Sequence, residues 1–239
     1  MHRHASSWWI AAFLLSFPLG GCADTHFEAA QHHLQDGQET EARRALELEI
    51  ASRPNNLQAR YNLAVLLERI GHDKDAAALY RENLKRGRHL ASVVNLSAWL
   101  RRQGRTGEAR KLLQQATQDY PAEAVPWYLL ADMAQQNGNK QQAAGLFREA
   151  IKADDKNGYA HLRFARFLAS SGDISKAVAQ ADQAVRLLPE CAPCLDITGD
   201  IFSQAGKKRR ALALWQRSIA IEPNDALRSK IRQALKTIR

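Results

Sequence analysis

The sequence contains few of the residues that mark small disulfide-rich, fibrous or disordered proteins. Its 239 residues include only 3 cysteines, 13 glycines and 7 prolines. So few cysteines exclude a disulfide-dense scaffold, and so little glycine and proline excludes a collagen-like or low-complexity chain. With 45% hydrophobic and 25% charged residues, the chain can bury a core and is long enough for one large domain or two small ones.

The sequence also lacks the short motifs of common enzyme classes. It has no G-x-x-x-x-G-K-[ST], no G-x-G-x-x-G, no G-x-S-x-G and no H-E-x-x-H. His32 and His33 are adjacent, so on a helix their side chains point about 100° apart and cannot chelate one ion. We interpret them as surface or groove residues and expect a protein that is not an enzyme and has no metal or cofactor.

An almost wholly apolar stretch, WWIAAFLLSF, occupies residues 8–17 and follows one fixed positive charge at Arg3. It has the length of a signal-peptide core and is too short to span a bilayer. It ends in PLGGC at residues 18–22, which resembles the lipobox of bacterial lipoproteins. The resemblance implies that residues 1–21 are removed and that Cys22 carries three acyl chains, which suits firm anchoring because one chain alone binds membranes only marginally. An ordinary secretory signal with a coincidental cysteine is the alternative.

The residues after Cys22 bear on the membrane that would hold the anchor. In the lipoprotein family an aspartate directly after the cysteine retains the protein in the inner membrane, and Ala23 stands there instead. Asp24, one position later, weakens that argument a little. The expected location is the outer membrane, with the chain facing the periplasm.

The remainder of the sequence repeats with a period of 34 residues, shortened once to 33. One glycine recurs in each unit, and an alanine follows each glycine after five residues. The glycines are Gly37, Gly71, Gly104, Gly138, Gly172 and Gly206, and the alanines are Ala42, Ala76, Ala109, Ala143, Ala177 and Ala211. Four units close with Pro54, Pro121, Pro189 and Pro223. A fixed period of this length indicates a repeat architecture.

Each unit has the pattern of two amphipathic helices. In residues 124–157 the stretch WYLLADMAQQN places apolar residues on one face at helical spacing, and KQQAAGLFREAIKA repeats that pattern after Gly138. Glycine ends the first helix because it adopts positive φ without strain. Alanine suits a close crossing of the two helices, and the closing proline cannot continue the second helix.

The unit resembles the tetratricopeptide repeat. Its family pattern is carried by Trp127, Leu130, Ala131, Ala143, Phe147 and Ala150. The resemblance implies an all-α, right-handed superhelical solenoid of six helix–turn–helix units followed by a C-terminal capping helix. The expected units are 23–56, 57–89, 90–123, 124–157, 158–191 and 192–225, within a repeat domain of 22–225, and the cap is 226–239.

Two units depart from the pattern. The first has His26, Ala29 and His33 at the positions of the family's large residues, although Thr25 and Glu28 have the spacing of a capping box. The second is one residue short, which predicts a local irregularity at residues 86–88.

In the family, the first helix of each unit lines a concave groove. The resemblance therefore implies a protein-binding groove whose candidate residues are Tyr61, Asn62, Asn95, Arg102, Tyr128, Arg163 and Arg166, accompanied by Arg69, Val94, Arg101, Asp132, Tyr159, Asp196 and Asp200. Asparagine both donates and accepts hydrogen bonds, so Asn62 and Asn95 suit a peptide backbone, and the arginines favour carboxylates. The groove is expected to be basic in its middle and acidic near its C-terminal end.

Cys191 and Cys194 form a C-x-x-C in the expected turn between the fifth and sixth units. A haem-attachment site would need histidine at position 195, which is leucine, and a thioredoxin-like site would need a strand before the helix. A local disulfide and two small buried thiols both remain open, and a redox-active pair is a further alternative.

The net charge of +9 belongs to one end of the chain. Residues 207–239 hold ten of the Lys and Arg residues against Glu222 and Asp225, whereas residues 22–206 are neutral. We expect no nucleic-acid binding, and an acidic partner is the candidate for the basic end. The combined pattern is similar in plan to lipoproteins of type IV pilus biogenesis and of tight-adherence secretion. It predicts a lipid-anchored scaffold that assembles or stabilises an envelope complex; an adaptor for cell-wall enzymes and a redox accessory using Cys191 and Cys194 are the alternatives.

Overall fold

The computed structural model describes residues 25–237, which form thirteen α-helices and no strands. The helices are α1 (His26–Gln35), α2 (Glu39–Ser52), α3 (Leu57–Arg69), α4 (Asp73–Arg86), α5 (Leu90–Arg102), α6 (Thr106–Asp119), α7 (Ala124–Gln136), α8 (Lys140–Ala153), α9 (Gly158–Ser170), α10 (Ile174–Leu187), α11 (Ala192–Gln204), α12 (Lys208–Ile221) and α13 (Asp225–Thr237).

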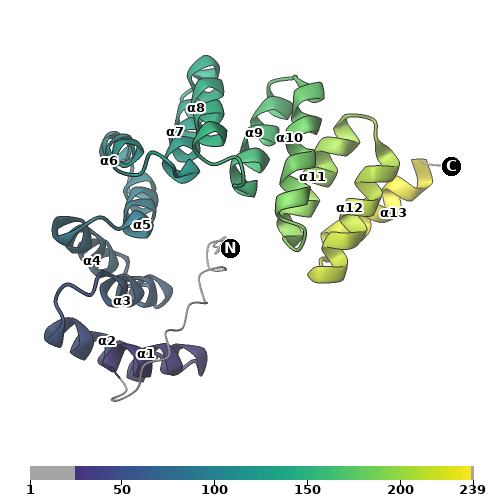
Figure 1. Cartoon of the computed structure of the whole chain (residues 1–239). Helices are drawn as coiled ribbons and strands as arrows, with labels where there is room; N and C mark the ends of the chain where they lie inside the picture. Colours follow the sequence, from purple (N-terminus) through teal and green to yellow (C-terminus); the bar gives the residue numbers. More distant parts are fainter. Residues whose placement is uncertain (1–24, 238–239) are drawn as a thin grey trace.

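Consecutive helices pack as six pairs that follow one another along an arc, with α13 lying against the last pair (Figure 1). Each pair contacts the next through its second helix, and the first helix α9 also contacts both α7 and α11 directly. Each pair contacts mainly its neighbours, so the core is a continuous strip along the arc. The predicted all-α superhelical solenoid is confirmed.

The repeated glycines and alanines have the conformations that the pattern predicts. All six glycines adopt positive φ, between 72° and 88°, at the turn between the two helices of a pair. The six alanines that follow are 0% exposed, which allows the two helices of each pair to approach closely. The four closing prolines stand two residues beyond the ends of α2, α6, α10 and α12.

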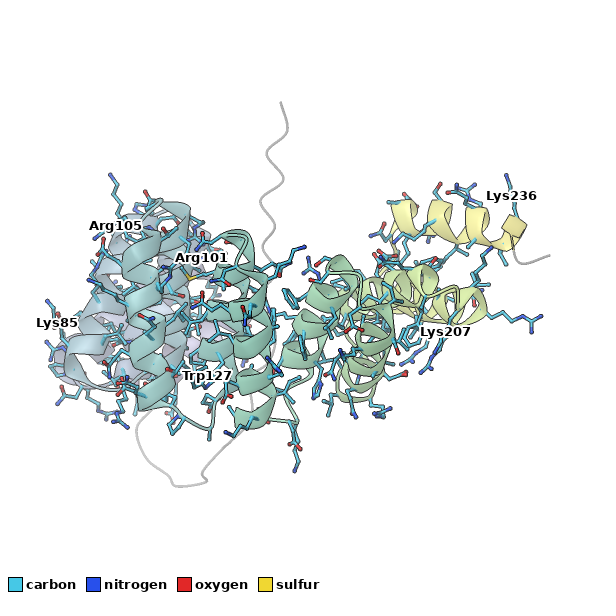
Figure 2. The ribbon with its side chains drawn as sticks, turned by 90° about the horizontal axis from the view of Figure 1, so that it is seen from above. Lys85, Arg101, Arg105, Trp127, Lys207 and Lys236 are labelled. Carbon is cyan, nitrogen blue, oxygen red and sulfur yellow. A yellow bond between two sulfur atoms is a disulfide. The ribbon has the colours of Figure 1, made fainter. Side chains whose placement is uncertain are left out.

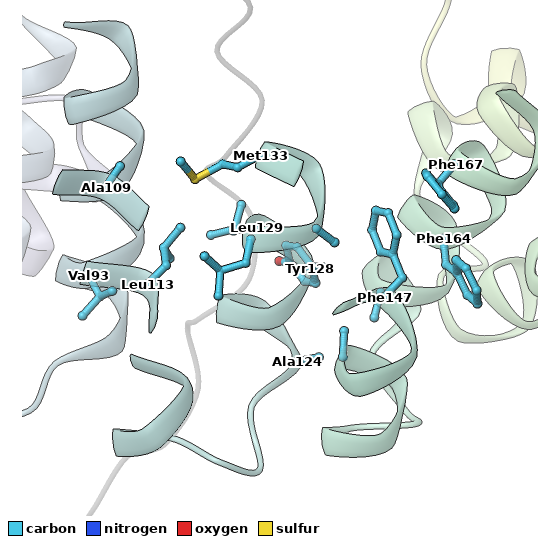
Figure 3. Close-up of a cluster of buried hydrophobic side chains, with 14 of the residues drawn as sticks. Val93, Ala109, Leu113, Ala124, Tyr128, Leu129, Met133, Phe147, Phe164 and Phe167 are labelled. Carbon is cyan, nitrogen blue, oxygen red and sulfur yellow. The ribbon is translucent and has the colours of Figure 1, made fainter. Parts of the chain in front are cut away.

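Three phenylalanine rings meet between the fourth and fifth pairs. Phe147 of α8 packs against Phe164 and Phe167 of α9, with ring centroids 5.6 and 5.3 Å apart. Tyr128 and Leu129 of α7 continue this cluster towards the third pair (Figure 3). Aromatic rings in one continuous cluster therefore join adjacent repeats.

Three repeats carry a polar residue where the others have a buried alanine near the end of the second helix. Asn83 and Ser218 are 0% and 4% exposed. Each donates to the first carbonyl of its own pair, Asn83 to Leu57 at 2.8 Å and Ser218 to Ala192 at 2.7 Å. Glu49, 1% exposed, instead accepts from the Asn56 side chain that caps α3. These bonds satisfy polar groups that would be costly to bury alone.

The two irregular units keep the repeat geometry. The predicted capping box at α1 is confirmed, because Thr25 accepts from the Glu28 amide while the Glu28 side chain accepts from the Thr25 amide. In the second unit the missing residue shortens the link between α4 and α5, while both helices keep the lengths found in the other units. None of the helices in residues 25–237 is both long and apolar enough to cross a membrane.

Candidate functional groove

A groove with a volume of about 2450 Å³ runs along the first helices of the pairs. Its lining comes from α1, α3, α5, α7, α9 and α11, together with Asp73 at the start of α4. These helices face it with polar side chains and with some apolar ones, among them Val65 and Val94, whereas most of their large apolar side chains belong to the core. The groove is therefore built by the repeat itself.

All seven residues of the candidate set lie on this lining: Tyr61, Asn62, Asn95, Arg102, Tyr128, Arg163 and Arg166. They differ in accessibility. Tyr128 is only 2% exposed, so its ring forms part of the floor and presents little surface to a ligand. Tyr159 and Asp196, which belong to the wider set, are not part of the lining.

The N-terminal part of the groove holds a hydrogen-bond network between three helices. The Tyr80 hydroxyl, on α4, donates to Glu68 at 2.7 Å and accepts from Asn95 Nδ2 at 2.9 Å. Asn95 Nδ2 also reaches the Tyr61 hydroxyl at 3.5 Å, and Arg102 pairs with Glu68 at 2.8 Å. Burial raises the pKa of both tyrosines, so both phenols stay protonated and Tyr80 can donate to Glu68.

Glu68 and Tyr80 take part in this network although neither belongs to the predicted groove set. Tyr80 occupies the aromatic position of the second helix, and its ring is fully buried as that position predicts. In the sequence, Tyr80 differs from Phe147, its equivalent in the fourth unit, by a hydroxyl group. A tyrosine at a core position needs a polar partner, and here that partner lies in the groove.

The centre of the groove gathers three arginines around one carboxylate. Arg163 of α9 forms an ion pair with Asp132 of α7 and lies over the Tyr128 ring, 4.8 Å from its centroid. Burial raises the pKa of Asp132, opposed by the charges of Arg163, Arg101 and Arg166. Burial likewise raises the pKa of Tyr128 to about 12. The middle of the groove is therefore positive overall.

At the C-terminal end of the groove, Asp200 of the lining and the nearby Asp196 are bonded to the capping helix. Lys230 of α13 donates to Asp196 at 2.9 Å and to Asp200 at 2.6 Å, and its ammonium lies 5.2 Å from the centroid of the Trp215 ring. The single positive charge of Lys230 thus balances only one of the two aspartates that were expected to make this end acidic.

The basic end of the chain is also partly neutralised. Arg210 forms an ion pair with Asp182, and Arg228 pairs with Asp225 at 2.9 Å. Lys207, the cap residue of α12, and Lys236 of α13 lie well apart (Figure 2). The basic residues of this end are therefore distributed over the last pair and α13.

Cys191 and Cys194 are joined by a disulfide. The expectation that they lie in a turn is wrong for Cys194, because α11 begins at Ala192, with Pro193 in its first turn. Cys191 caps this helix and accepts from the Cys194 amide at 3.3 Å. Cys194 is 4% exposed and packs with Leu162 and Ala184.

Two further expectations concern other positions. The signal segment 1–21 and the lipidation site Cys22 lie outside the described residues. Within residues 25–237, no group of three or more His, Cys, Asp or Glu side chains is placed to hold a metal ion. His32 pairs with Asp36 at 2.9 Å, and the His33 ring contacts Gln38; both histidines lie away from the groove lining.

Two family models match the chain over most of the described residues. One tetratricopeptide repeat family matches residues 27–89 and 100–158, and a second matches residues 134–196. The chain belongs to the tetratricopeptide repeat family. No curated protein sequence matches this repeat protein.

Solved structures share its fold at low identity. A chain of the APC/C hetero-tetramer Cut9–Hcn1 superposes with a TM-score of 0.68 at 17% identity over 88% of the repeat protein, which spans 42% of that longer chain. PilF of Pseudomonas aeruginosa matches with a TM-score of 0.66 at 20% identity, covering 87% of the repeat protein and 95% of PilF. A thermophilic TPR protein from Thermus thermophilus gives 0.61 at 20% identity, covering 75% and 98%. At such identities the likeness concerns the fold.

Proposed function

We propose that this repeat protein is a lipid-anchored, non-enzymatic scaffold that holds a segment of another protein in its groove and thereby assembles or stabilises an envelope complex. The groove is the observation that carries the proposal. It runs across the first helices of all six repeats, with amide, phenol and guanidinium groups along it. Repeat proteins use such extended concave surfaces for binding.

The anchor is argued from the sequence. Leu19, two glycines and Cys22 follow a short apolar core, and acyl chains on Cys22 would hold the protein on the periplasmic face of the outer membrane. Only three residues separate Cys22 from α1, so the first repeat would lie beside the bilayer and the C-terminal end would project away. Pilus and secretion assemblies are the candidate complexes because of the shared plan and the fold common to PilF.

In-cell photocrosslinking tests the scaffold function. A photoreactive amino acid at Asn95 or Arg163 should capture one discrete protein, and the same group at Arg110, exposed on the second helix α6, should not. The absence of a specific product from both groove positions contradicts the proposal. Equal products from Arg110 would contradict it as well, because the contact would then be non-specific.

The anchor is tested separately by Cys22→Ser. We expect the variant to lose labelling by a palmitate analogue and to leave the membrane fraction. A variant that stays acylated and membrane-bound would disprove anchoring through Cys22. Cysteines introduced at Glu28 and Lys236 report orientation, and the membrane should shield only the label at position 28.

A further inference from the structure

We propose that Arg101 and Arg166, on either side of Asp132, form a site for carboxylate side chains of an acidic segment in the partner protein. The inference rests on the proposed function, because it specifies the chemistry of the segment held in the same groove. It is carried by an imbalance of charge at the centre of the groove and by the groups that lie beside it.

The imbalance arises because one carboxylate faces three guanidinium groups. Asp132 is paired with Arg163. Arg101 donates to the neutral side chain of Gln136 at 3.2 Å. Arg166 is exposed and forms no hydrogen bond or ion pair with any of the residues that the structure describes. Two positive charges are therefore left near one another, at a point where each acts on Asp132.

The other cations of the groove differ from these two because each has an acidic partner. Arg69 has Glu39 at 3.1 Å, and Arg102 has Glu68 at 2.8 Å. The chain thus supplies a carboxylate for each of these two arginines and omits it for Arg101 and Arg166. A guanidinium group binds a carboxylate through two parallel hydrogen bonds, so an acidic ligand supplies what is missing.

The framework around the two arginines is rigid enough to hold them apart. Arg163 is fixed between Asp132 and the buried Tyr128 ring, and its helix α9 also presents Arg166. Arg101 projects from α5, across α7 from α9. A ligand that reaches both guanidinium groups must therefore span α7, which requires at least two carboxylates or an extended chain.

The neighbouring amides favour a polypeptide over phosphate or a lipid headgroup. Asn62 accepts from Gln58 at 2.8 Å and uses no donor of its own within the described residues. Asn95 uses its amide nitrogen for Tyr61 and Tyr80, and its oxygen accepts no hydrogen bond from the described residues. One donor and one acceptor on adjacent first helices match a peptide backbone, which needs both.

Apolar side chains continue the groove towards the N-terminus. Leu34, Val65 and Val94 line it and are half-buried, with the Tyr61 ring beside them. The segment that fits is thus acidic between Arg101 and Arg166 and aliphatic along Leu34, Val65 and Val94. A small anion would leave most of the 2450 Å³ groove unfilled.

Fluorescence anisotropy with the purified full-length protein tests this site. The acidic probe is a labelled synthetic peptide with leucine and alanine in one half and glutamates in the other, and the neutral probe replaces each glutamate by glutamine. We expect the acidic probe to bind about tenfold more tightly, since charge-assisted hydrogen bonds are roughly twice as strong as neutral ones. Added salt should reduce the difference by screening it.

The decisive variant is Arg101→Ala/Arg166→Ala, and the matched control is Arg110→Ala/Arg186→Ala. The control removes the same charge from exposed positions on α6 and α10. The groove variant should bind both probes with the affinity of the neutral probe, while the control should keep the preference. Equal binding of the two probes by the wild type, or an equal loss in both variants, overturns the inference.

Competition separates the possible sources of the anion. Inorganic phosphate and phosphatidylglycerol vesicles should displace the acidic probe only weakly. If either binds through Arg101 and Arg166 more tightly than the acidic peptide, a polypeptide ligand is disproved. Crosslinking from Asn95 distinguishes this failure from failure of the scaffold function. A partner still captured by Arg101→Ala/Arg166→Ala refutes only the acidic site, whereas acidic-probe binding without any captured partner refutes only the scaffold function.

Discussion

A Cβ atom on Gly199 would lie 2.4 Å from Nε1 of Trp215. The equivalent positions in the fourth and fifth units hold Ala131 and Ala165, both fully buried. The sixth unit needs glycine because Trp215 occupies the aromatic position of α12 and its indole N–H reaches the Asp196 carbonyl at 3.3 Å. The large Trp215 ring therefore fits against α11 only because residue 199 has no methyl group.

Replacing Gly199 by alanine should consequently destabilise the C-terminal repeats. The added methyl group overpacks the α11–α12 crossing, and we expect the free energy of unfolding to fall by about 1–3 kcal/mol. Urea denaturation followed by circular dichroism measures the change. Gly145→Ala is the control, because a Cβ there meets nothing within 4 Å; it should raise helix stability by roughly 0.5–1 kcal/mol. Similar effects of the two variants would contradict the packing argument.

The helices, turns and groove-facing positions could be predicted because each depends on local residues repeated with one period. Gly138 and Ala143, for example, specify a turn and a close crossing without reference to the rest of the chain. Contacts between repeats could not be predicted in this way. The bond from Asn95 to Tyr80 and that from Lys230 to Asp200 depend on how adjacent units rotate along the arc.

The position of Cys194 in a helix could have been predicted from Pro193, the residue before it, although the spacing of the repeat suggests a turn. Proline is favoured in the first turn of a helix because the missing N–H has no partner there. Pro193 therefore indicates that α11 begins before Cys194, as the structure shows. The spacing of the repeat alone places both cysteines in the link.

Asn83 provides a second test of the junction between the second and third units. It accepts from the buried guanidinium group of Arg60 at 3.1 Å and donates to Leu57 and to Ser92. Asn83→Ala removes three hydrogen bonds of buried groups, one of them to a charged guanidinium, so we expect a loss of about 2–3 kcal/mol in the free energy of unfolding. Ser218→Ala, which removes one bond at the equivalent position, should cost about 1 kcal/mol. Equal losses in urea denaturation would argue against the network.

The buried phenol of Tyr128 should make the free energy of unfolding depend on pH in the alkaline range. Burial raises its pKa to about 12, above the value of about 10 for an unfolded chain. The folded state thus holds the phenolic proton longer, and this contribution to stability is present below pH ~10 and is lost as the pH rises towards ~12. Absorbance of tyrosinate, compared between the wild type and Tyr128→Phe, isolates this titration. A difference spectrum with a midpoint near pH ~10 would show that the phenol is not buried.

The disulfide should contribute stability without affecting the groove. In the chain-entropy model a loop this short contributes about 2 kcal/mol, and Cys194 also packs with Leu162 and Ala184. Reduction of the wild type should lower the free energy of unfolding by about that amount, and Cys191→Ala/Cys194→Ala should no longer respond to reductant. Binding of the acidic peptide should be the same in both. Loss of cellular function with fold and binding intact would instead favour a redox role.

The ion pairs of Lys230 should help to hold the capping helix α13 against α11. The Lys230 ammonium group bonds two aspartates of α11 and lies over Trp215, whereas Lys236 on the same helix is exposed. Because Lys230 is itself partly exposed, solvent screening limits the expected loss for Lys230→Ala to about 1 kcal/mol, confined to α13. Hydrogen exchange of the α13 amides should accelerate in Lys230→Ala and not in Lys236→Ala. The same variant leaves Asp196 and Asp200 without their cation, so it should also weaken binding of the acidic peptide through added negative charge. Faster exchange in both variants, or in neither, would show that apolar packing of Leu227 and Ile231 alone holds the cap.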